Sequence, residues 1–232
     1  MEEARISIVI PVLDEAETLP ATLAALQGLR RLGHEVVVVD GGSRDGTPRI
    51  AEAVADRVVT SPPGRARQMN AGAAAATRAV LLFLHADTLL PPQADRRILE
   101  ALGAGRIWGR FDVRLSGSAW PFRVIERMMN WRSRLSGMAT GDQAIFVRRE
   151  AFVRIGGFPE IPLMEDLELS RRLRRHGRPA CLRPPVVTSS RRWEERGIVP
   201  TVLLMWGLRL AWFLGVPPRR LARLYRPVRA RP

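Results

Sequence analysis

The sequence has no lysine, and a single cysteine and a single tyrosine occur among its 232 residues. Cys181 has no second cysteine to pair with in this chain, so an internal disulfide is excluded and a reducing compartment is favoured. Residues 1–5 are acidic and lack the basic start and apolar stretch of a signal peptide. We therefore expect a cytoplasmic protein, with the inner face of the membrane as an alternative location.

Because lysine is absent, all 37 basic side chains are arginines, whose planar groups bind phosphate through paired hydrogen bonds. Their distribution is uneven. Residues 1–100 contain 11 arginines and 13 acidic residues, whereas residues 101–232 contain 26 and 10. The basic second part is interpreted either as a solvated arginine surface or as a surface that attracts anionic lipid or phosphate.

The first part of the chain alternates between strand and helix patterns. Apolar runs at 6–12, 35–40 and 79–85 have the length and β-branched content of strands buried on both faces. Helical patterns at 18–31, 47–55 and 65–77 separate them, and Thr18 is a candidate cap for the first. Such alternation predicts an α/β fold in three layers, with a mainly parallel central sheet.

The second part is less regular, with strands expected near 107–115, 143–148 and 180–187 and helices near 119–135 and 165–176. The chain has 46% hydrophobic and 26% charged residues, which is typical of a globular protein. No internal repeat or low-complexity linker divides it. We predict one domain over 1–196 and a helical tail over 197–232.

The tail is apolar from 198 to 216 except for Arg209, and a basic amphipathic stretch follows at 219–226. A helix over 200–215 would be about 24 Å long, which is shorter than a hydrocarbon core of roughly 30 Å. We expect no membrane span. Segment 198–226 is predicted either to lie in a membrane interface or to pack on the sheet or a second subunit.

Polar residues follow three successive apolar strands, at the edge of an α/β sheet where ligands bind. Asp14 and Glu15 follow the first strand, Asp40 ends the second, and His85 and Asp87 end the third. Each has a local explanation as a cap or a turn residue. Carboxylates that converge on one edge repel each other unless a cation or a hydrogen-bonding ligand lies among them.

These segments resemble family 2 glycosyltransferases of the GT-A fold. The resemblance is carried by residues 8–15, 38–47, 64–72 and 84–88, and further on by 156–159 with 165–166. It extends over about residues 5–190. It implies a GT-A type three-layer sandwich with a C-terminal helical extension, and the transfer of a sugar from a nucleotide-diphosphate sugar to an acceptor hydroxyl.

The resemblance implies a nucleotide-binding set. Its members are Pro11, Asp14, Glu15, Asp40, Gly41, Ser43, Arg65, Asn70 and Ala86. Carboxylates would accept hydrogen bonds from the base and the ribose. Family members often have a second aspartate where this chain has Gly41. The identity of the nucleobase is therefore undecided, and a UDP-sugar is the favoured donor. Arg65 has an alternative reading as a solvated residue that opens a helix.

A divalent ion, Mn²⁺ or Mg²⁺, is implied at Asp87, where it would stabilise the departing nucleoside diphosphate. The family usually has an aspartate two residues earlier, where this chain has His85. We expect His85 to orient the sugar or the diphosphate. The alternative is that His85 is a structural residue at the end of a strand, with its ring hydrogen-bonded to the backbone.

Asp166 is the candidate general base, with Glu165 beside it. A single displacement with one base predicts inversion at the anomeric carbon. Ordinary acidic residues in a helix's first turn are the alternative. Asp142 resembles a residue in a loop that floors the acceptor pocket. Arg192 and Trp193 resemble an arginine–tryptophan pair for the diphosphate and the sugar, although Trp193 is equally typical of core.

Three other functions remain possible. A nucleotidyltransferase should have a glycine-rich loop after its first strand, whereas this chain has no glycine from 6 to 27. A basic module that binds membrane or nucleic acid leaves the acidic edge unexplained, and we expect no nucleic-acid partner. A degenerate nucleotide-sugar binder would retain the site without turnover. The acceptor is either a lipid, which suits the apolar tail, or a soluble molecule.

Overall fold

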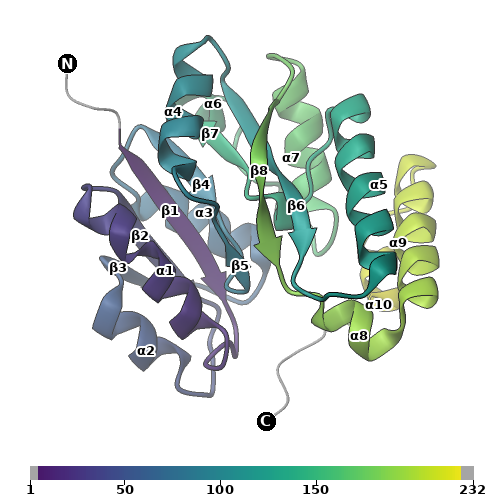
Figure 1. Cartoon of the computed structure of the whole chain (residues 1–232), viewed down its shortest axis with the longest axis horizontal. Helices are drawn as coiled ribbons and strands as arrows, with labels where there is room; N and C mark the ends of the chain where they lie inside the picture. The colour runs from purple at the N-terminus through teal and green to yellow at the C-terminus, as the bar shows by residue number, and fades with distance from the viewer. Residues whose placement is uncertain (1–4, 226–232) are drawn as a thin grey trace.

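The computed structural model describes residues 5–225 (Figure 1). Its strands are β1 (Ile6–Val12), β2 (Glu35–Asp40), β3 (Arg57–Thr60), β4 (Val80–Phe83), β5 (Thr88–Leu89), β6 (Trp108–Leu115), β7 (Phe146–Arg148) and β8 (Ala180–Thr188). Its helices are α1 (Leu19–Arg31), α2 (Thr47–Val54), α3 (Arg65–Ala75), α4 (Ala94–Gly103), α5 (Trp120–Ser136), α6 (Arg149–Arg154), α7 (Glu165–Arg174), α8 (Arg191–Arg196), α9 (Ile198–Phe213) and α10 (Pro218–Leu224), with a 3-10 turn at Gly141–Gln143.

One sheet runs through the molecule in the order β3-β2-β1-β4-β7-β6-β8-β5. The first four of these strands are parallel, β7 is antiparallel to both of its neighbours, and β6 is parallel to β8. In the parallel part, Val12 pairs with Asp40 and Val9 pairs with Phe83. The ends of β1, β2 and β4 therefore meet at one edge, as the apolar runs predicted.

Two apolar cores lie on opposite faces of the sheet. One combines alternate residues of β1 and β2 with the inner faces of α1 and α4, and includes Leu23 and Ile98. The other combines the remaining alternate residues with α3, α6 and α7, and includes Met69, Phe152 and Leu169. Helices thus cover both faces (Figure 1), and the predicted three layers are confirmed.

Helix α3 lies unusually close to the sheet at Gly72. A Cβ there would lie 2.7 Å from Cγ2 of Val39 and would also overlap Val9. Neither valine can move away readily, because both are fully buried within the second core. A residue without a side chain is therefore required at this crossing.

The C-terminal helices pack on the rest of the chain. Leu208 of α9 and Leu221 of α10 are buried in a cluster with Met164 and Leu167, which lie at the start of α7. Within the described residues, no helix has the length and apolarity to cross a bilayer. The described part of the tail therefore packs on the rest of the chain, which is one of the alternatives stated above, and its contact with a membrane stays a prediction. Residues 226–232 of the predicted tail lie outside the described part.

The predicted elements agree with the observed ones to within a few residues. The tail helix predicted over 200–215 is α9, and the basic stretch that follows includes α10. The sequence reading missed β3, β5, α4, α6 and α8. Most of these are short, and their stability comes from packing rather than from a local pattern. Thr18 is at the N-cap of α1, but its hydroxyl donates to Glu15 instead of capping the helix.

Replacing Gly72 by alanine is expected to destabilise the chain by about 1–3 kcal/mol, because the new methyl group overpacks the contact between α3 and the sheet. Urea unfolding followed by circular dichroism measures this change. Gly28→Ala in α1 is the matched control, since nothing lies within 4 Å of a Cβ at that position. Equal unfolding free energies for the two variants would contradict the packing argument.

Candidate active site

Side-chain oxygens hold together the loops that follow β1 and β2. The amide of Asp14 donates to Oγ of Ser43 at 2.9 Å, and the Asp14 carboxylate accepts from the amide of Arg44 at 2.8 Å. The amide of Glu15 donates to Oγ1 of Thr47 at 2.9 Å. Asp14 has a backbone φ of 55°, which residues other than glycine rarely adopt, so these bonds stabilise a strained turn.

The predicted residue Asp40 organises the second of these loops. Its carboxylate accepts from the amide of Gly42 at 3.0 Å and from Oγ of Ser43 at 2.5 Å. Gly41 is explained by the buried side chain of Gln68, which a Cβ at position 41 would meet at 3.0 Å. Gln68 donates to the carbonyls of Val12 and Val39, and so joins the ends of β1 and β2.

Asn70 and Ala86 also make internal contacts. The amide group of Asn70 forms two 2.9 Å hydrogen bonds with the backbone of Phe158 and so fixes the glycine-rich loop 156–159. The carbonyl of Ala86 accepts from Oγ1 of Thr22 at 2.5 Å. Pro11 lies in β1 opposite Val39. These contacts are structural, and the predicted role of these residues at a nucleotide stays a prediction.

Asp87 lies at the centre of a charged cluster. Burial raises the pKa of its carboxyl, whereas nearby Arg65 and Arg191 lower it. Burial likewise raises the pKa of Glu15, to which the charge of Asp87 also contributes. A guanidinium nitrogen of Arg191 lies 4.0 Å from the Glu15 carboxylate. The structure therefore brings the predicted Glu15, Arg65 and Asp87 together, and adds Arg191.

His85 is neutral at physiological pH. Burial, together with the charges of Arg65 and Arg192, lowers the pKa of its imidazole to about 3. The ring lies against the 3-10 turn, where a Cβ on Gly141 would be 2.7 Å from Nε2 of His85. A neutral imidazole can donate one hydrogen bond and accept another, or bind a metal ion.

The two acids at the start of α7 differ in their surroundings. The Asp166 carboxylate accepts from the amides of Gly141 and Leu167, at 2.8 and 2.7 Å. Glu165 is buried, and burial together with the charge of Asp166 raises its pKa to about 7. Burial raises the pKa of Asp166 as well, but its two backbone donors oppose the shift. Asp166 is therefore the acid of the pair that we expect to ionise first.

Of the remaining predicted residues, Asp142 and Arg192 lie near the site and Trp193 packs elsewhere. Asp142 accepts from Oγ1 of Thr140 at 2.5 Å, on the turn beneath Asp166. The Arg192 guanidinium lies 4.5 Å from the ring centre of Tyr225. Trp193 is partly buried against the apolar cluster between α5 and α9, which agrees with its alternative reading as core, and its stacking on a sugar stays a prediction.

The residues around Asp87 fit a divalent ion held jointly with a substrate. Among residues 5–225 no group of three or more histidine, cysteine or acidic side chains could hold a metal by itself. Asp87 nevertheless offers a carboxylate whose described side-chain hydrogen bond, from Thr88, is long at 3.4 Å. His85, two residues earlier in the chain, offers a neutral ring. One or two such ligands are sufficient when phosphate oxygens complete the coordination.

The sequence family described as Glycosyl transferase family 2 matches residues 7–158, which contain Asp14, Asp40, Asp87 and Asp142. The chain belongs to this family. The resemblance to family 2 glycosyltransferases that the sequence motifs indicated is thereby confirmed.

Among curated relatives, an uncharacterized glycosyltransferase of Mycobacterium tuberculosis is 34% identical over 134 residues, which cover 56% of this chain and 59% of the relative. The undecaprenyl-phosphate 4-deoxy-4-formamido-L-arabinose transferase of Pseudomonas fluorescens is 31% identical over 158 residues, which cover 62% of this chain and 46% of the relative. The chain thus spans about half the length of the curated relatives that it matches.

Solved structures confirm the predicted GT-A fold. The mannosyltransferase PcManGT of Pyrobaculum calidifontis, in complex with GDP-Man and Mn²⁺, superposes with a TM-score of 0.65 at 23% identity, covering 98% of this chain and 66% of that one. TarS 1–349 of S. aureus, in complex with UDP-GlcNAc, gives a TM-score of 0.66 at 17% identity, covering 80% and 58%.

The sequence reading missed several residues that the fold brings to the site. Arg132 of α5 and Arg209 of α9 lie near Asp166: after burial, the charges of Arg209, Asp142 and Asp166 influence the pKa of Arg132, and the charge of Arg209 lowers that of Asp166. Tyr225 lies beside Arg192. A signal for Arg209 exists, since it is the one charged residue of the apolar segment 198–216. Arg132 has none, because α5 contains several other arginines.

Glu165→Gln is expected to flatten the dependence of stability on pH. The folded-state pKa of Glu165, about 7, is above its ordinary value of 4.5, so its contribution to stability is full below 4.5 and is lost as the pH rises through 7. Between about pH 5 and about pH 8 the wild type should lose on the order of 2–3 kcal/mol more than the variant.

Urea unfolding at the two pH values measures this difference. Glu168→Gln is the matched control on the same helix. Hydrogen bonds from Arg171, and to a smaller extent from Arg172, lower the pKa of Glu168 and keep it ionised over this range. Parallel pH profiles for Glu165→Gln and the wild type would contradict the assignment.

Proposed function

We propose that this chain transfers a sugar from a nucleotide-diphosphate sugar to an acceptor, with inversion and with the assistance of a divalent ion. The convergence of Glu15, Asp87, Arg65 and Arg191 beside the acid pair of α7 carries the proposal. Membership of the family supports it. The GT-A neighbours in complex with GDP-Man and UDP-GlcNAc support a nucleotide sugar as the donor.

The donor's diphosphate would lie among the arginines of this cluster. Arg65 begins α3 and is exposed at the surface; desolvation lowers its pKa, but Tyr225 and the acids Glu165, Asp166 and Asp87 outweigh that effect and raise it. The guanidinium therefore stays charged and is able to bind phosphate oxygens. Arg191 and Arg192 approach from the start of α8. Asp14, Glu15, Asp40 and Ser43 would position the nucleoside through the loops that they hold in place.

Asp87 would hold a divalent ion, Mn²⁺ or Mg²⁺, with phosphate oxygens of the donor. When bound, such an ion supplies Lewis-acid stabilisation of the leaving diphosphate. Mn²⁺ in the complex of the Pyrobaculum enzyme supports this choice. His85, which is neutral, would orient the diphosphate or the sugar. The role of the arginines is the same with or without the ion, since they neutralise charge that develops on the leaving group.

Asp166 would act as the general base toward the acceptor, with Glu165 as its protonated neighbour. Its two backbone donors fix the carboxylate in one orientation. One base and one displacement give inversion. The acceptor is proposed to be a lipid, which the name of the Pseudomonas relative supports.

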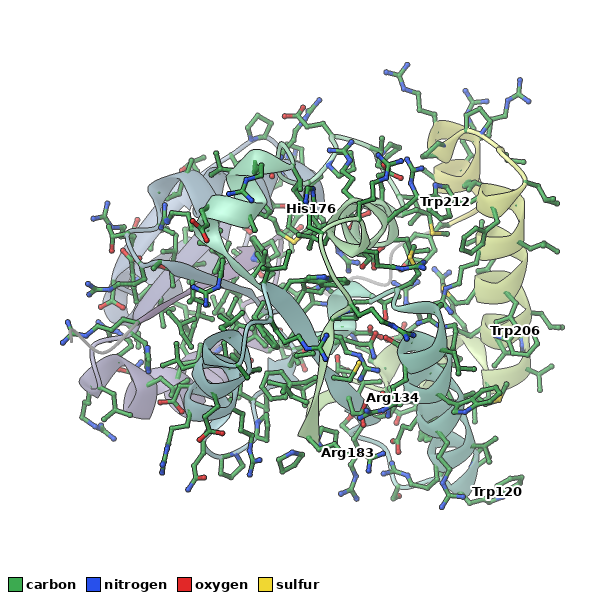
Figure 2. The ribbon with its side chains drawn as sticks, turned by 90° about the horizontal axis from the view of Figure 1, so that it is seen from above. Trp120, Arg134, His176, Arg183, Trp206 and Trp212 are labelled. Atoms are coloured by element: carbon green, nitrogen blue, oxygen red, sulfur yellow. The ribbon has the colours of Figure 1, made fainter. Side chains whose placement is uncertain are left out.

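Contact with a membrane surface would bring such an acceptor to the site. Helix α5 exposes an apolar stripe that consists of Trp120, Val124, Met128, Trp131 and Leu135. Helix α9 exposes a second stripe, Val199, Leu203, Trp206, Leu210 and Phe213. The two helices lie side by side, and Trp120 and Trp206 project along the same side of the molecule (Figures 1 and 2). Together the stripes resemble the apolar face of interfacial helices.

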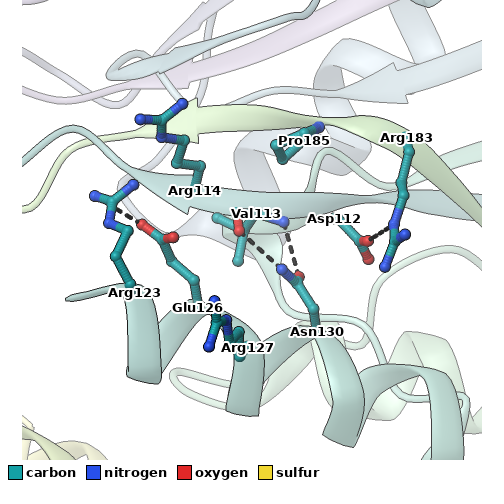
Figure 3. Close-up of a pocket in the computed structure, with 9 residues that line it drawn as sticks. All are labelled: Asp112, Val113, Arg114, Arg123, Glu126, Arg127, Asn130, Arg183 and Pro185. Carbon is teal, nitrogen blue, oxygen red and sulfur yellow. Dashed lines mark hydrogen bonds and ion pairs between the residues drawn. The ribbon is translucent and has the colours of Figure 1, made fainter. Parts of the chain in front are cut away.

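Arginines flank this apolar face. A groove of about 370 Å³ between α5 and strands β6 and β8 is lined by Arg114, Arg123, Arg127 and Arg183 (Figure 3). Arg183 is paired with Asp112 at 2.9 Å. Arg123 is paired with Glu126 at 3.0 Å, so the four arginines of the groove outnumber its two acids. Arg127 precedes Met128 of the apolar stripe in α5, so the groove adjoins the stripe. We infer that the face fits an anionic bilayer at the inner side of a membrane.

Asp87→Asn and Asp166→Asn are each expected to reduce nucleotide release by about 100-fold or more. A panel of UDP-, GDP- and dTDP-sugars with Mn²⁺ is the assay, and it also identifies the base. Glu52→Gln, an exposed residue of α2, is the control and should remain fully active. Unchanged turnover of Asp87→Asn would remove the metal role. Donor binding without any turnover in the wild type would indicate a degenerate binder.

Trp131→Glu and Leu210→Glu are each expected to weaken binding to phosphatidylglycerol-containing vesicles by about tenfold or more, because a charge replaces an inserted apolar group. Vesicle co-sedimentation measures the partition, with phosphatidylcholine vesicles as the neutral comparison. Leu32→Glu, at the end of α1, is the matched control, since Leu32 is 64% exposed against 68% for Trp131. Equal partition of all the variants would exclude this face as the contact.

A further inference from the structure

Arg132 of α5 is a partly buried arginine whose guanidinium has unsatisfied donors. Its Nε and Nη2 atoms are shielded from solvent and have no hydrogen-bond partner in the described structure. None of the ion pairs within residues 5–225 includes Arg132. Leaving a charged donor unpaired away from water is costly, so such groups are normally explained by a ligand or a role in function.

A second guanidinium lies close to the first. Burial lowers the pKa of Arg132 to about 10, and the charge of Arg209 contributes in the same direction. Arg209 follows Leu208, which is buried against Leu167 at the start of α7. This packing holds Arg209 close to Asp166 and Arg132, although none of the described ion pairs includes it. Two like charges held together in this way repel each other unless an anion lies between them.

This arginine pair is separate from the arginines of the donor side. Arg65, Arg191 and Arg192 surround Asp87, Glu15 and Tyr225. Arg132 and Arg209 instead have Asp142 and Asp166 as their acidic neighbours. Asp166 borders both groups, so the pair is on the acceptor side of the proposed base.

The outer surfaces of the same two helices indicate what kind of acceptor fits. Helices α5 and α9 each present an arginine toward the site and an apolar stripe toward solvent. A ligand that reaches the site between them would place a charged group near the arginines and apolar parts toward the exposed stripes. An amphiphile with a phosphate group matches this arrangement.

We propose that Arg132 and Arg209 form a binding site for a phosphate group of the acceptor, beside Asp166. The proposal rests on the proposed glycosyl transfer for its biological meaning. The anion site itself is tested without turnover. The two guanidinium groups bind the phosphate by charge-assisted hydrogen bonds and position the acceptor for attack on the sugar.

The test is isothermal titration calorimetry of the full chain with citronellyl phosphate, a short prenyl phosphate, and separately with inorganic phosphate. Arg132→Gln and Arg209→Gln should each weaken binding of citronellyl phosphate by about tenfold or more. Arg49→Gln removes the same charge from an exposed position of α2, outside the residues assigned to either binding site, and should bind as the wild type does. The donor panel identifies which nucleoside diphosphate the protein binds. The affinity of all three variants for that nucleotide should stay within about twofold of the wild-type value.

A second measurement separates ligand binding from a structural role. Arg132→Gln removes a repelled and unpaired charge, so its Tm should equal or exceed that of the wild type, whereas loss of a structural arginine would lower it. Arg132→Lys keeps the charge and should restore part of the affinity.

The outcomes distinguish the sources of the phosphate. Binding of citronellyl phosphate but not of inorganic phosphate supports a lipid acceptor, and equal binding of the two supports a soluble phosphorylated acceptor. Absence of binding by the wild type, or equal binding by Arg132→Gln, would overturn the proposal. Failure of donor binding alone would overturn the proposed transfer and leave the anion site standing.

Discussion

Hydrogen bonds from backbone amides to the side-chain oxygens of Asp14, Asp40, Ser43 and Thr47 determine the shape of the sheet edge. These bonds connect two loops that belong to neighbouring parallel strands. Each amide would otherwise lie at a loop without a backbone partner, so the side chains satisfy donors that the sheet cannot. The rest of the site is positioned relative to this edge, because Asp87 follows the next strand in the same parallel register.

These residues therefore have two roles in our interpretation. Asp40 and Asn70 were identified as candidate ligands of a nucleotide, and both are found making internal hydrogen bonds. A carboxylate that fixes a loop can still present its remaining lone pairs to a ligand, and its rigidity lowers the entropy lost on binding. Gly41 has a structural reason as well, because the Gln68 side chain occupies the space that a side chain at position 41 would need.

The electrostatics of the site arise from burial more than from pairing. Burial is the largest influence on the pKa values of Glu15, His85, Asp87, Glu165 and Asp166. Opposite charges are near, but few of them form close ion pairs. Such an arrangement lowers the stability of the folded protein when the site is empty, and it favours the binding of a charged ligand. The unpaired guanidinium of Arg132 is the clearest example.

The amino-acid pattern alone predicted the three layers, the strands β1, β2 and β4, and the edge of the sheet on which Asp14, Asp40 and Asp87 lie. Strand periodicity and parallel pairing are local or nearest-neighbour properties, so apolar runs record them directly. The short elements β3, β5, α6 and α8 and the position of Trp193 were decided by tertiary packing. The same is true of Arg132 and Arg209, which belong to helices far apart in the chain. Their proximity arises because Leu208 of α9 is buried against α7 and Ile198 packs, partly buried, against α5, and no local pattern encodes these contacts.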